Sequence, residues 1–345
     1  MKDLVDHLRD CHELTPEQYR ALLTMRNRLD VDYLMQQARE VSQQHFGKGI
    51  YVRGLIELSN ACRNNCLYCG IRRSNRHVAR YTLSREQVLA CCQQGYDLGF
   101  RTFVLQGGEW GEEQSQWIAQ LIGEIRQRWS DCAITLSLGE HPRETYALWR
   151  EAGANRYLLR HETHSQRHYS LLHPAEMSHA HRLQCLEWLK EVGYQVGTGI
   201  MVGSPFQTIG NIVEDIEFLV DFKPHMIGIG PFIPQHDMPL GRFPAGSVGL
   251  TARLYAILRL ALPHALIPST TAMATLATDG RLRGILAGAN VVMPNLSPTD
   301  TRKQYALYDN KASLGAESSQ GLKALAAELA TIGYHINWSR GDAPR

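Results

Sequence analysis

Short apolar and β-branched runs alternate with longer amphipathic segments over most of this chain, and this alternation restricts its fold more than any other feature. The short runs predict strands at 51–59, 102–106, 133–138, 155–160, 195–202, 225–230, 266–271 and 289–293. The segments between them predict helices at 84–98, 113–128, 143–152, 178–192, 208–222 and 250–261. Strands that alternate with helices form a parallel sheet, because the chain must cross back over the sheet between neighbouring strands.

About eight such units in roughly 250 residues are typical of a closed (β/α)8 barrel of the TIM type, which is an α/β fold. An open doubly wound sheet is the alternative. We expect an N-terminal helical extension over 1–47, the barrel over 48–310 and a C-terminal helical extension over 311–345 that closes the barrel. Within the first part, Thr15 followed by Pro16 is typical of a helix start.

Composition and charge exclude several classes of protein. The formal net charge of +2 in 345 residues gives no electrostatic support to a role in binding nucleic acid or a membrane surface. No apolar run is long enough to span a bilayer, and the first residues mix acids and bases instead of forming a signal peptide. We therefore expect a cytoplasmic protein whose eight cysteines are free thiols or metal ligands.

Polar residues follow most of the predicted strands. They include Asn60, Glu109, Glu140, Glu162, Thr271 and Asn295. In a parallel barrel the carboxyl ends of the strands meet at one rim, and active sites lie at that rim. The sequence therefore predicts one large polar cavity there.

Three cysteines, Cys62, Cys66 and Cys69, follow the first predicted strand in the spacing C-x3-C-x2-C. Thiolates are soft ligands that suit iron–sulfur clusters and zinc. A 4Fe–4S cluster usually takes four cysteines. Three would leave one iron free to bind the amino and carboxylate groups of S-adenosylmethionine, a cofactor of radical chemistry. The alternative is structural zinc, which needs a fourth ligand such as His77.

The motif, with the aromatic Tyr68 just before its last cysteine, resembles that of the radical S-adenosylmethionine superfamily. Gly107-Gly108-Glu109, after the second predicted strand, resembles the glycine-rich segment of the same superfamily, whose backbone holds the methionyl amino group. The resemblance implies a (β/α)8 barrel with two cofactors, a 4Fe–4S cluster and S-adenosyl-L-methionine.

Longer segments resemble the HydE family of FeFe-hydrogenase maturases over roughly residues 50–310. They are ELSNACRNNCLYCGIRRSN, TLSLGEHPRE, RYLLRHET, GIGPFIPQHDMPL, PSTTAMAT and ANVVMPNLSPTDTRKQYALY. This resemblance implies a role in building the organometallic di-iron subcluster of the hydrogenase. It also implies a substrate and partners: an organometallic iron–cysteine complex carrying CO and cyanide, companion maturases, and an electron donor such as ferredoxin or flavodoxin.

The same resemblance assigns roles to individual residues. The cluster ligands would be Cys62, Cys66 and Cys69. The residues in contact with S-adenosylmethionine would be Tyr68, Gly107, Gly108, Glu109, Ser137, Glu162, Arg182 and Met201. The residues acting on the substrate would be Arg53, Arg160 and Tyr305, and those lining the inner cavity would be Thr135, Thr270, Thr271, Met293 and Tyr308. Arginines deep in a barrel need an anion, which the substrate would supply.

Several of these residues also have purely structural interpretations. Arg182 would be solvated if it behaved like most arginines. Met201 and Met293 would be core packing. Thr270 and Thr271 would simply end a β-branched strand.

Two further groups have alternatives of the same kind. Tyr305 and Tyr308 are three residues apart and would pack a C-terminal helix. The clustered histidines have a metal site as one interpretation. They are His161, His164, His168, His179 and His181. We expect helix-surface histidines instead, because no carboxylate or cysteine completes a ligand set.

The remaining cysteines predict a single cluster. Some members of the HydE family carry three more cysteines near the C-terminus for a second cluster, whereas no cysteine follows Cys185 here. Biotin-synthase-like enzymes hold an auxiliary cluster on barrel cysteines, but Cys132 precedes the third strand and Cys185 lies within a helix. The rival functions are such an enzyme, a zinc-stabilised binding module without catalysis, and a methylornithine synthase (a lysine mutase). The mutase should need an acidic residue near the strand ends for a substrate ammonium.

Overall fold

The computed structural model describes residues 1–312 and 315–344 and contains a parallel sheet of six strands in the order β2-β3-β4-β5-β6-β8. The bounds are β2 Gly54–Ser59, β3 Thr102–Gly107, β4 Ala133–Ser137, β5 Arg156–Leu158, β6 Gln195–Thr198 and β8 Met226–Ile227. Each strand falls on a predicted one. The aliphatic residues that mark the strands in the sequence are buried under the surrounding helices, as parallel sheets require.

Parallel pairing continues beyond this sheet. The strand β1 (Gly49–Val52) leads into β2 and pairs with β10 (Val291–Val292). Single parallel bridges join Met226 to Leu266, Pro268 to Val291, and Leu55 to Asn295. The pairing thus runs from β8 through residues 266–268 and β10 back to β1 and β2, which favours the predicted barrel over an open sheet.

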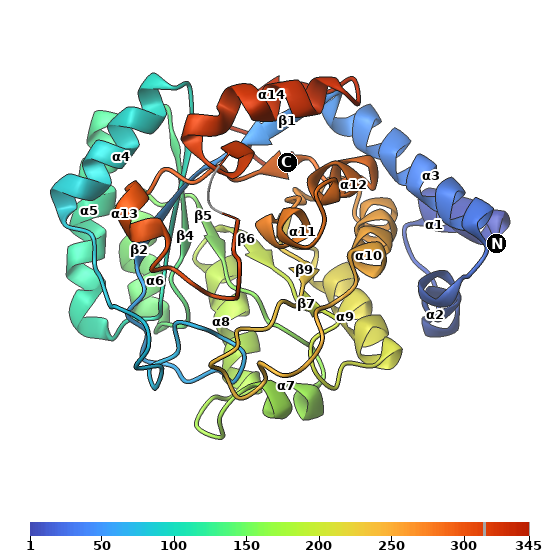
Figure 1. Ribbon diagram of the computed structural model, residues 1–345, viewed down its shortest axis with the longest axis horizontal. Helices are drawn as coiled ribbons and strands as arrows, with labels where there is room; N and C mark the ends of the chain where they lie inside the picture. Colours follow the sequence, from blue (N-terminus) through green and yellow to red (C-terminus); the bar gives the residue numbers. More distant parts are fainter. Residues whose placement is uncertain (313–314, 345) are drawn as a thin grey trace.

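Six helices follow strands of the barrel and match the six predicted ones to within a few residues. They are α4 Arg85–Asp97, α5 Ser115–Arg128, α6 Arg143–Glu151, α8 His179–Glu191, α9 Ile209–Phe222 and α10 Val248–Ala261. Figure 1 shows them arranged around the strands. Side-chain caps fix the starts of α4, α8, α9 and α10, and at Ser84 and Thr208 the cap and the third helical residue exchange hydrogen bonds.

The remaining short elements connect or cover the barrel. They are η1 Glu112–Gln114, α7 Gln166–Leu172, β7 Met201–Val202, β9 Gly230–Pro231, α11 Thr271–Leu276, α12 Gly280–Leu286, α13 Thr299–Arg302, η2 Gly315–Glu317, η3 Ser319–Gly321, α14 Leu322–Ala330 and β11 His335–Asn337. Two predictions are wrong here. The strand predicted at 266–271 stops short, because Thr271 begins α11. The C-terminal segment is not only helical, because β11 pairs with β1.

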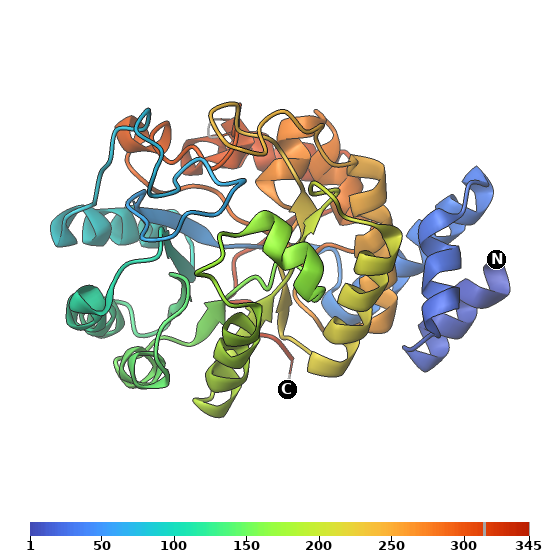
Figure 2. The same ribbon diagram turned by 90° about the horizontal axis from the view of Figure 1, so that it is seen from below.

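The first residues form three helices, α1 Lys2–Cys11, α2 Pro16–Thr24 and α3 Arg28–Phe46. Thr15 caps α2 as predicted, with its hydroxyl accepting from the Gln18 amide. Apolar residues of these helices share one core cluster with α9 and α10. Figure 2 shows the three helices at one end of the molecule. No helix of the described residues is long and apolar enough to cross a membrane.

The C-terminal residues close the barrel floor, at the amino ends of the strands. Arg156 donates to Asp342 at 2.5 Å and to the carbonyl of Arg340 at 3.1 Å. Arg53 donates to the carbonyl of Gly341 at 3.3 Å. The chain itself therefore supplies partners to both inward-facing arginines, although Arg53 Nε has no hydrogen-bond partner among the described residues.

Candidate functional site

A cavity of about 330 Å³ opens at the carboxyl ends of the strands, where the sequence predicts it. Its walls include twelve of the predicted site residues, which are Tyr68, Cys69, Gly107, Ser137, Arg160, Glu162, Met201, Thr270, Thr271, Met293, Tyr305 and Tyr308. The two tyrosines belong to a non-helical segment, so the alternative of a packed helix is wrong for them.

The three cysteines lie in the loop that follows β2, against one wall of this cavity. Arg80 holds the backbone of the loop in place, because its guanidinium donates to the carbonyls of Ile71 at 2.7 Å and Asn75 at 3.0 Å. The Glu109 amide donates to the Cys62 sulfur at 3.4 Å. Such N–H···S contacts stabilise thiolate ligands of a metal cluster.

The cysteine set suits a cluster better than zinc. Burial raises the pKa of the Cys69 thiol to about 12 and that of Cys66 well above its ordinary value, so binding of any metal by these thiols would release their protons. Zinc would draw its ligands tightly together. Among the described residues, however, the ligand atoms of Glu140, His181 and Cys185 are the only set of three within 4.8 Å of one another.

His77, the proposed fourth zinc ligand, is directed elsewhere. Its ring is exposed and its Nδ1 lies 3.1 Å from Asp237 Oδ1. Three cysteines without a fourth ligand fit a cuboidal cluster with one open iron, because each cysteine then binds a different iron at a wider spacing.

The glycine-rich turn after β3 packs directly on the cysteine loop. A Cβ at Gly108 would lie 2.1 Å from the Ala61 carbonyl oxygen, so only glycine fits there. Gly107 lines the cavity, and a Cβ there would make only ordinary contacts, at 3.5 Å from Leu138 and the Ser59 carbonyl oxygen. The prediction for Glu109 needs correction: its carboxylate does not line the cavity but accepts from Arg63 Nε at 2.9 Å and from the Glu140 amide at 2.8 Å.

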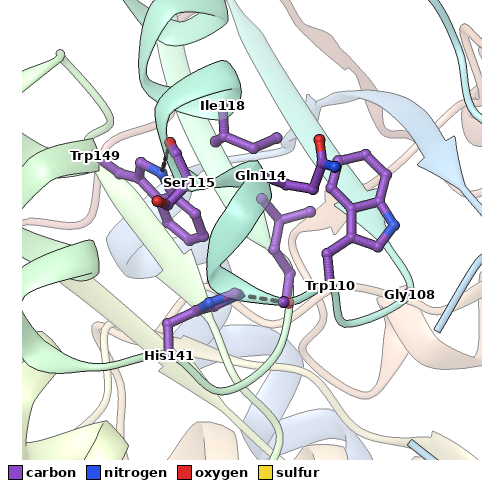
Figure 3. Close-up of a pocket in the computed structure, with 9 residues that line it drawn as sticks. Gly108, Trp110, Gln114, Ser115, Ile118, His141 and Trp149 are labelled. Atoms are coloured by element: carbon purple, nitrogen blue, oxygen red, sulfur yellow. Dashed lines mark hydrogen bonds between the residues drawn. The ribbon is translucent and has the colours of Figure 1, made fainter. Parts of the chain in front are cut away.

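Aromatic packing supports this turn from behind. Figure 3 shows Trp110, His141 and Trp149 beside this turn. The void that they line measures only about 10 Å³, and Trp149 Nε1 donates to the Ser115 carbonyl at 2.8 Å. A void of this size holds one water molecule at most. The aromatic side chains around the void therefore fix the position of the turn, and the void itself offers no room for a ligand.

Arg182 and Glu162 lie close to the cysteine loop, and Glu162 lines the cavity whereas Arg182 does not. Arg182 is only 8% exposed, so the alternative of a solvated residue is wrong. Its Nε donates to Glu140, and its Nη1 donates to the Arg160 carbonyl at 3.0 Å. Glu162 adopts φ +67°, a strained value for a residue with a side chain, and such strain is concentrated at functional sites.

Arg160 extends into the cavity, where its Nη2 lies 2.9 Å from the Glu162 carboxylate. Among the described residues, Arg160 Nε and the Thr270 hydroxyl are buried without a hydrogen-bond partner, while Nη2 makes only the ion pair with Glu162. Unpaired buried donors favour a bound ligand with acceptor atoms. The Thr271 hydroxyl is instead used by Glu317, to which it donates at 2.7 Å.

Two predicted cavity residues lie below the cavity. Arg53 belongs to the floor, where its Nη1 contacts Met226 Sδ at 3.0 Å. Thr135 precedes Ser137 by two residues and therefore lies on the same face of β4, deeper in the barrel. Neither residue lines the cavity. Strand alternation predicts the face on which a side chain lies, but it does not predict the depth of that side chain in the barrel.

The sequence analysis missed three polar wall residues, Glu57, Gln106 and Lys311. Glu57 shares the inward face of β2 with Leu55. A charged residue within a buried strand is unusual, and this was the sequence signal that could have identified Glu57 as a cavity residue. Lys311 gave no signal, because its segment has no regular hydrophobic period.

The histidines are more buried than expected. His161 and His168 are fully or almost fully buried. His161 Nδ1 lies 2.9 Å from the Thr198 hydroxyl, and its Nε2 lies 3.3 Å from Asp215. Burial lowers the pKa of His161 to about 3, so the ring is neutral. The expectation of surface histidines is wrong for these two: His161 supports the loop carrying Glu162, and His168 Nε2 lies 3.0 Å from the Pro205 carbonyl oxygen.

Known proteins resemble this chain over most of its length. The Radical SAM superfamily pattern matches residues 56–219. The chain is 42% identical over 299 residues to the FeFe-hydrogenase maturase subunit HydE of Thermotoga maritima, which covers 87% of this chain and 85% of the relative. It is 30% identical over 329 residues to 3-methylornithine synthase of Methanosarcina acetivorans, and the matched region covers 93% of this chain and 90% of the relative.

Solved structures show the same fold. The crystal structure of methylornithine synthase (PylB) matches with a TM-score of 0.86 and 25% identity over 97% of both chains. The hydrogenase maturase HydG matches with a TM-score of 0.82 and 19% identity over 97% of this chain and 75% of that one.

Proposed function

The chain belongs to the HydE family of the radical S-adenosylmethionine superfamily and is a radical enzyme of FeFe-hydrogenase maturation, and from this premise we propose how its own residues do that work. Cys62, Cys66 and Cys69 hold one 4Fe–4S cluster, and the cavity holds S-adenosylmethionine beside it. When bound, the cluster supplies the electron that cleaves S-adenosylmethionine to methionine and a 5′-deoxyadenosyl radical.

One observation carries this proposal: the half-buried Cys69 lines the same cavity as Glu162 and Arg160. The backbone of Gly107 faces the methionyl amino group. Glu162 accepts from the ammonium or a ribose hydroxyl, while the guanidinium of Arg182 attracts the carboxylate. The remaining contacts come from Tyr68, Gly108, Ser137 and Met201, and Glu109 serves through its amide hydrogen bond to Cys62.

The deeper part of the cavity holds the substrate. Free donors at Arg160 and Thr270 suit the cyanide or carboxylate of an organometallic iron–cysteine complex. Tyr305 acts on the bound substrate, and its hydroxyl accepts from Gln106 at 3.3 Å. The apolar parts of Met293, Tyr308 and Thr271 complete the wall and keep water away from the radical.

The chain carries a single cluster in this proposal. Cys91 and Cys92 are buried in α4, Cys185 is buried in α8, Cys11 is exposed on α1, and Cys132 precedes β4. None of the five lines the cavity. A sulfur-donating, biotin-synthase-like enzyme would need an auxiliary cluster next to its substrate, and these positions do not provide one.

An acidic electron carrier such as ferredoxin or flavodoxin docks above the cluster. No acidic residue occurs from Leu58 to Arg85, the stretch that contains the cysteine loop. Arg76 and Arg242 line one open surface depression, and Arg73 is exposed next to it. Complementary charge accelerates and orients such encounters. The companion maturases that deliver substrate and receive product are transient partners.

Methylornithine synthesis is the second candidate, favoured by the 30% identity to that enzyme and by Glu57, an acidic residue in the cavity wall. A lysine substrate would bring an ammonium that needs such a carboxylate. Here the carboxylate of Glu57 is already bound by Lys311, so the first function is the better supported one.

Anoxic reconstitution tests the proposed function. The wild type should bind about four irons per chain and form 5′-deoxyadenosine on reduction. Cys66→Ala should lose both, because two thiolates hold such a cluster poorly; Cys11→Ala, a cysteine exposed on α1, is the control. Zinc in the anoxic wild type, or deoxyadenosine formation by Cys66→Ala at the wild-type rate, would overturn the proposal.

A further inference from the structure

Glu57 is the most deeply buried charged group of the cavity wall, at 0% exposure. One carboxylate oxygen accepts from the Lys311 ammonium, and the other accepts from Asn295 Nδ2 at 2.9 Å. Both oxygens are therefore used by the chain itself. A carboxylate buried this deeply is stable only with a cation and hydrogen-bond donors around it.

Lys311 reaches Glu57 from a segment that crosses the mouth of the cavity. The segment is held at the Leu307 carbonyl, which accepts from the Gly70 amide at 2.9 Å, and at the Asp309 amide, which donates to the Pro234 carbonyl at 3.1 Å. The lysine side chain is 12% exposed, and its Nζ lies 4.7 Å from the centre of the Tyr305 ring. The ammonium is thus held between a carboxylate and an aromatic face, as a bound ligand cation would be.

The charges of the cavity wall balance in two pairs. Glu57 is paired with Lys311, and Glu162 is paired with Arg160. They are the only Asp, Glu, Lys or Arg side chains that line it among the described residues. Arg160 Nε and Glu162 Oε2 keep no hydrogen-bond partner among the described residues, whereas both oxygens of Glu57 are used. The cavity therefore offers donors to a ligand but offers no free carboxylate oxygen at Glu57.

We propose that Lys311 is a specificity-determining residue whose ammonium fills an ammonium subsite on Glu57. The filled subsite excludes diamino acids such as lysine, which would need that carboxylate. The cavity is left to an anionic or neutral ligand that accepts from Arg160 and Thr270. This inference rests on the proposed function only in using the same cavity, and it explains how a barrel so similar to methylornithine synthase rejects a diamino acid.

Removal of the lysine should therefore open the subsite. We compare the anoxic reconstituted wild type with Lys311→Met, Lys311→Arg and the double variant Lys311→Met with Glu57→Gln. Binding of L-lysine is measured by calorimetry at pH 7.5, with L-norleucine as a matched ligand of nearly equal shape that keeps the α-ammonium but lacks the side-chain ammonium. Lys311→Arg keeps a cation on Glu57 and should exclude L-lysine as the wild type does.

The expected result is that Lys311→Met binds L-lysine roughly tenfold to a hundredfold more tightly than the wild type does, the range for a charge-assisted hydrogen bond. The double variant should lose this gain, and L-norleucine should show no difference. Equal lysine binding by the wild type and Lys311→Met, or an undiminished gain in the double variant, would overturn the inference. Absence of deoxyadenosine formation by the wild type would instead overturn the proposed function and leave the binding result readable.

Discussion

The carboxylate of Asp342 is expected to anchor the barrel floor, and Asp342→Asn tests this. Arg156 has a fully buried side chain, and its Nη2 lies 2.5 Å from Asp342, whose side chain is 42% exposed. The substitution preserves shape but removes the anion. Leaving a buried charge unpaired costs about 3–5 kcal/mol, whereas an exposed ion pair contributes about 0–1 kcal/mol.

The structure places the loss between these limits, at about 2 kcal/mol. Solvent reaches Asp342 and weakens the pair, and Arg156 keeps its hydrogen bonds to the Arg340 carbonyl at 3.1 Å and the Thr102 hydroxyl at 3.2 Å. Arg53 adds to the cost, because burial and the charge of Arg156 lower its pKa while Asp342 raises it. In a chain of this size the loss lowers Tm by about 4 °C.

The effect should depend on pH in a defined direction. Burial alone would raise the pKa of Asp342, but Arg156 and Arg340 outweigh burial and lower it below its ordinary value. A carboxyl with a depressed folded pKa stabilises the protein above its unfolded pKa of about 3.9, and this stabilisation is lost as pH falls through the folded value. The difference between wild type and Asp342→Asn should be constant from about pH 5.5 to 8 and shrink below about pH 4.

Anoxic thermal unfolding at one scan rate measures this difference. Asp279→Asn is the matched control, because Asp279 pairs with Arg283 at 2.8 Å where both side chains are about half exposed, at 52% and 53%. The control should change stability by less than about 0.5 kcal/mol. Equal shifts for Asp342→Asn and Asp279→Asn would refute the idea that a buried guanidinium depends on the C-terminal carboxylate.

Two further substitutions separate the functions of the site. Arg160→Ala should lower hydrogenase maturation by at least about tenfold while deoxyadenosine formation falls less than about threefold, because its free donors suit the substrate; equal losses in the two assays would place Arg160 in the cofactor site. Arg73→Glu with Arg76→Glu should slow reduction by flavodoxin roughly tenfold and weaken its salt dependence, with no change when dithionite is the reductant. Arg28→Glu, a 93% exposed arginine on α3, is the control, and an equal effect there would rule out a specific docking surface.

Much of the fold follows from the period of the hydrophobic pattern. The strands and the six barrel helices were predictable, since both faces of a parallel strand and one face of each helix must be buried. The seventh strand was overextended because Thr270 and Thr271 have strand-like side chains. They lie at a turn where the backbone enters α11. The β-propensity of a side chain does not show where the fold requires a strand to end and a helix to begin.

The site was predictable where chemistry is local and unpredictable where it depends on distant pairing. Cysteine spacing identified the cluster ligands as candidates without any structure. The floor pair shows the opposite case, because nothing near Arg53 in the sequence reveals that Asp342 lies close to it. Lys311 and Glu57 are likewise separated by 254 residues. Only the closure of the barrel brings them together.

The cluster loop and the cavity mouth form one connected structure. The Gly70 amide donates to the Leu307 carbonyl at 2.9 Å, and Asn60 Nδ2 donates to the Gln304 carbonyl at 2.8 Å. The segment held by these bonds supplies Tyr305, Tyr308 and Lys311 to the cavity wall. Because metal ligation orders the loop that carries it, we expect cluster binding to fix the segment whose lysine occupies Glu57 as well. In the proposed function, electron entry and substrate selection then depend on the same two hydrogen bonds, although the residues that perform them come from opposite ends of the barrel sequence.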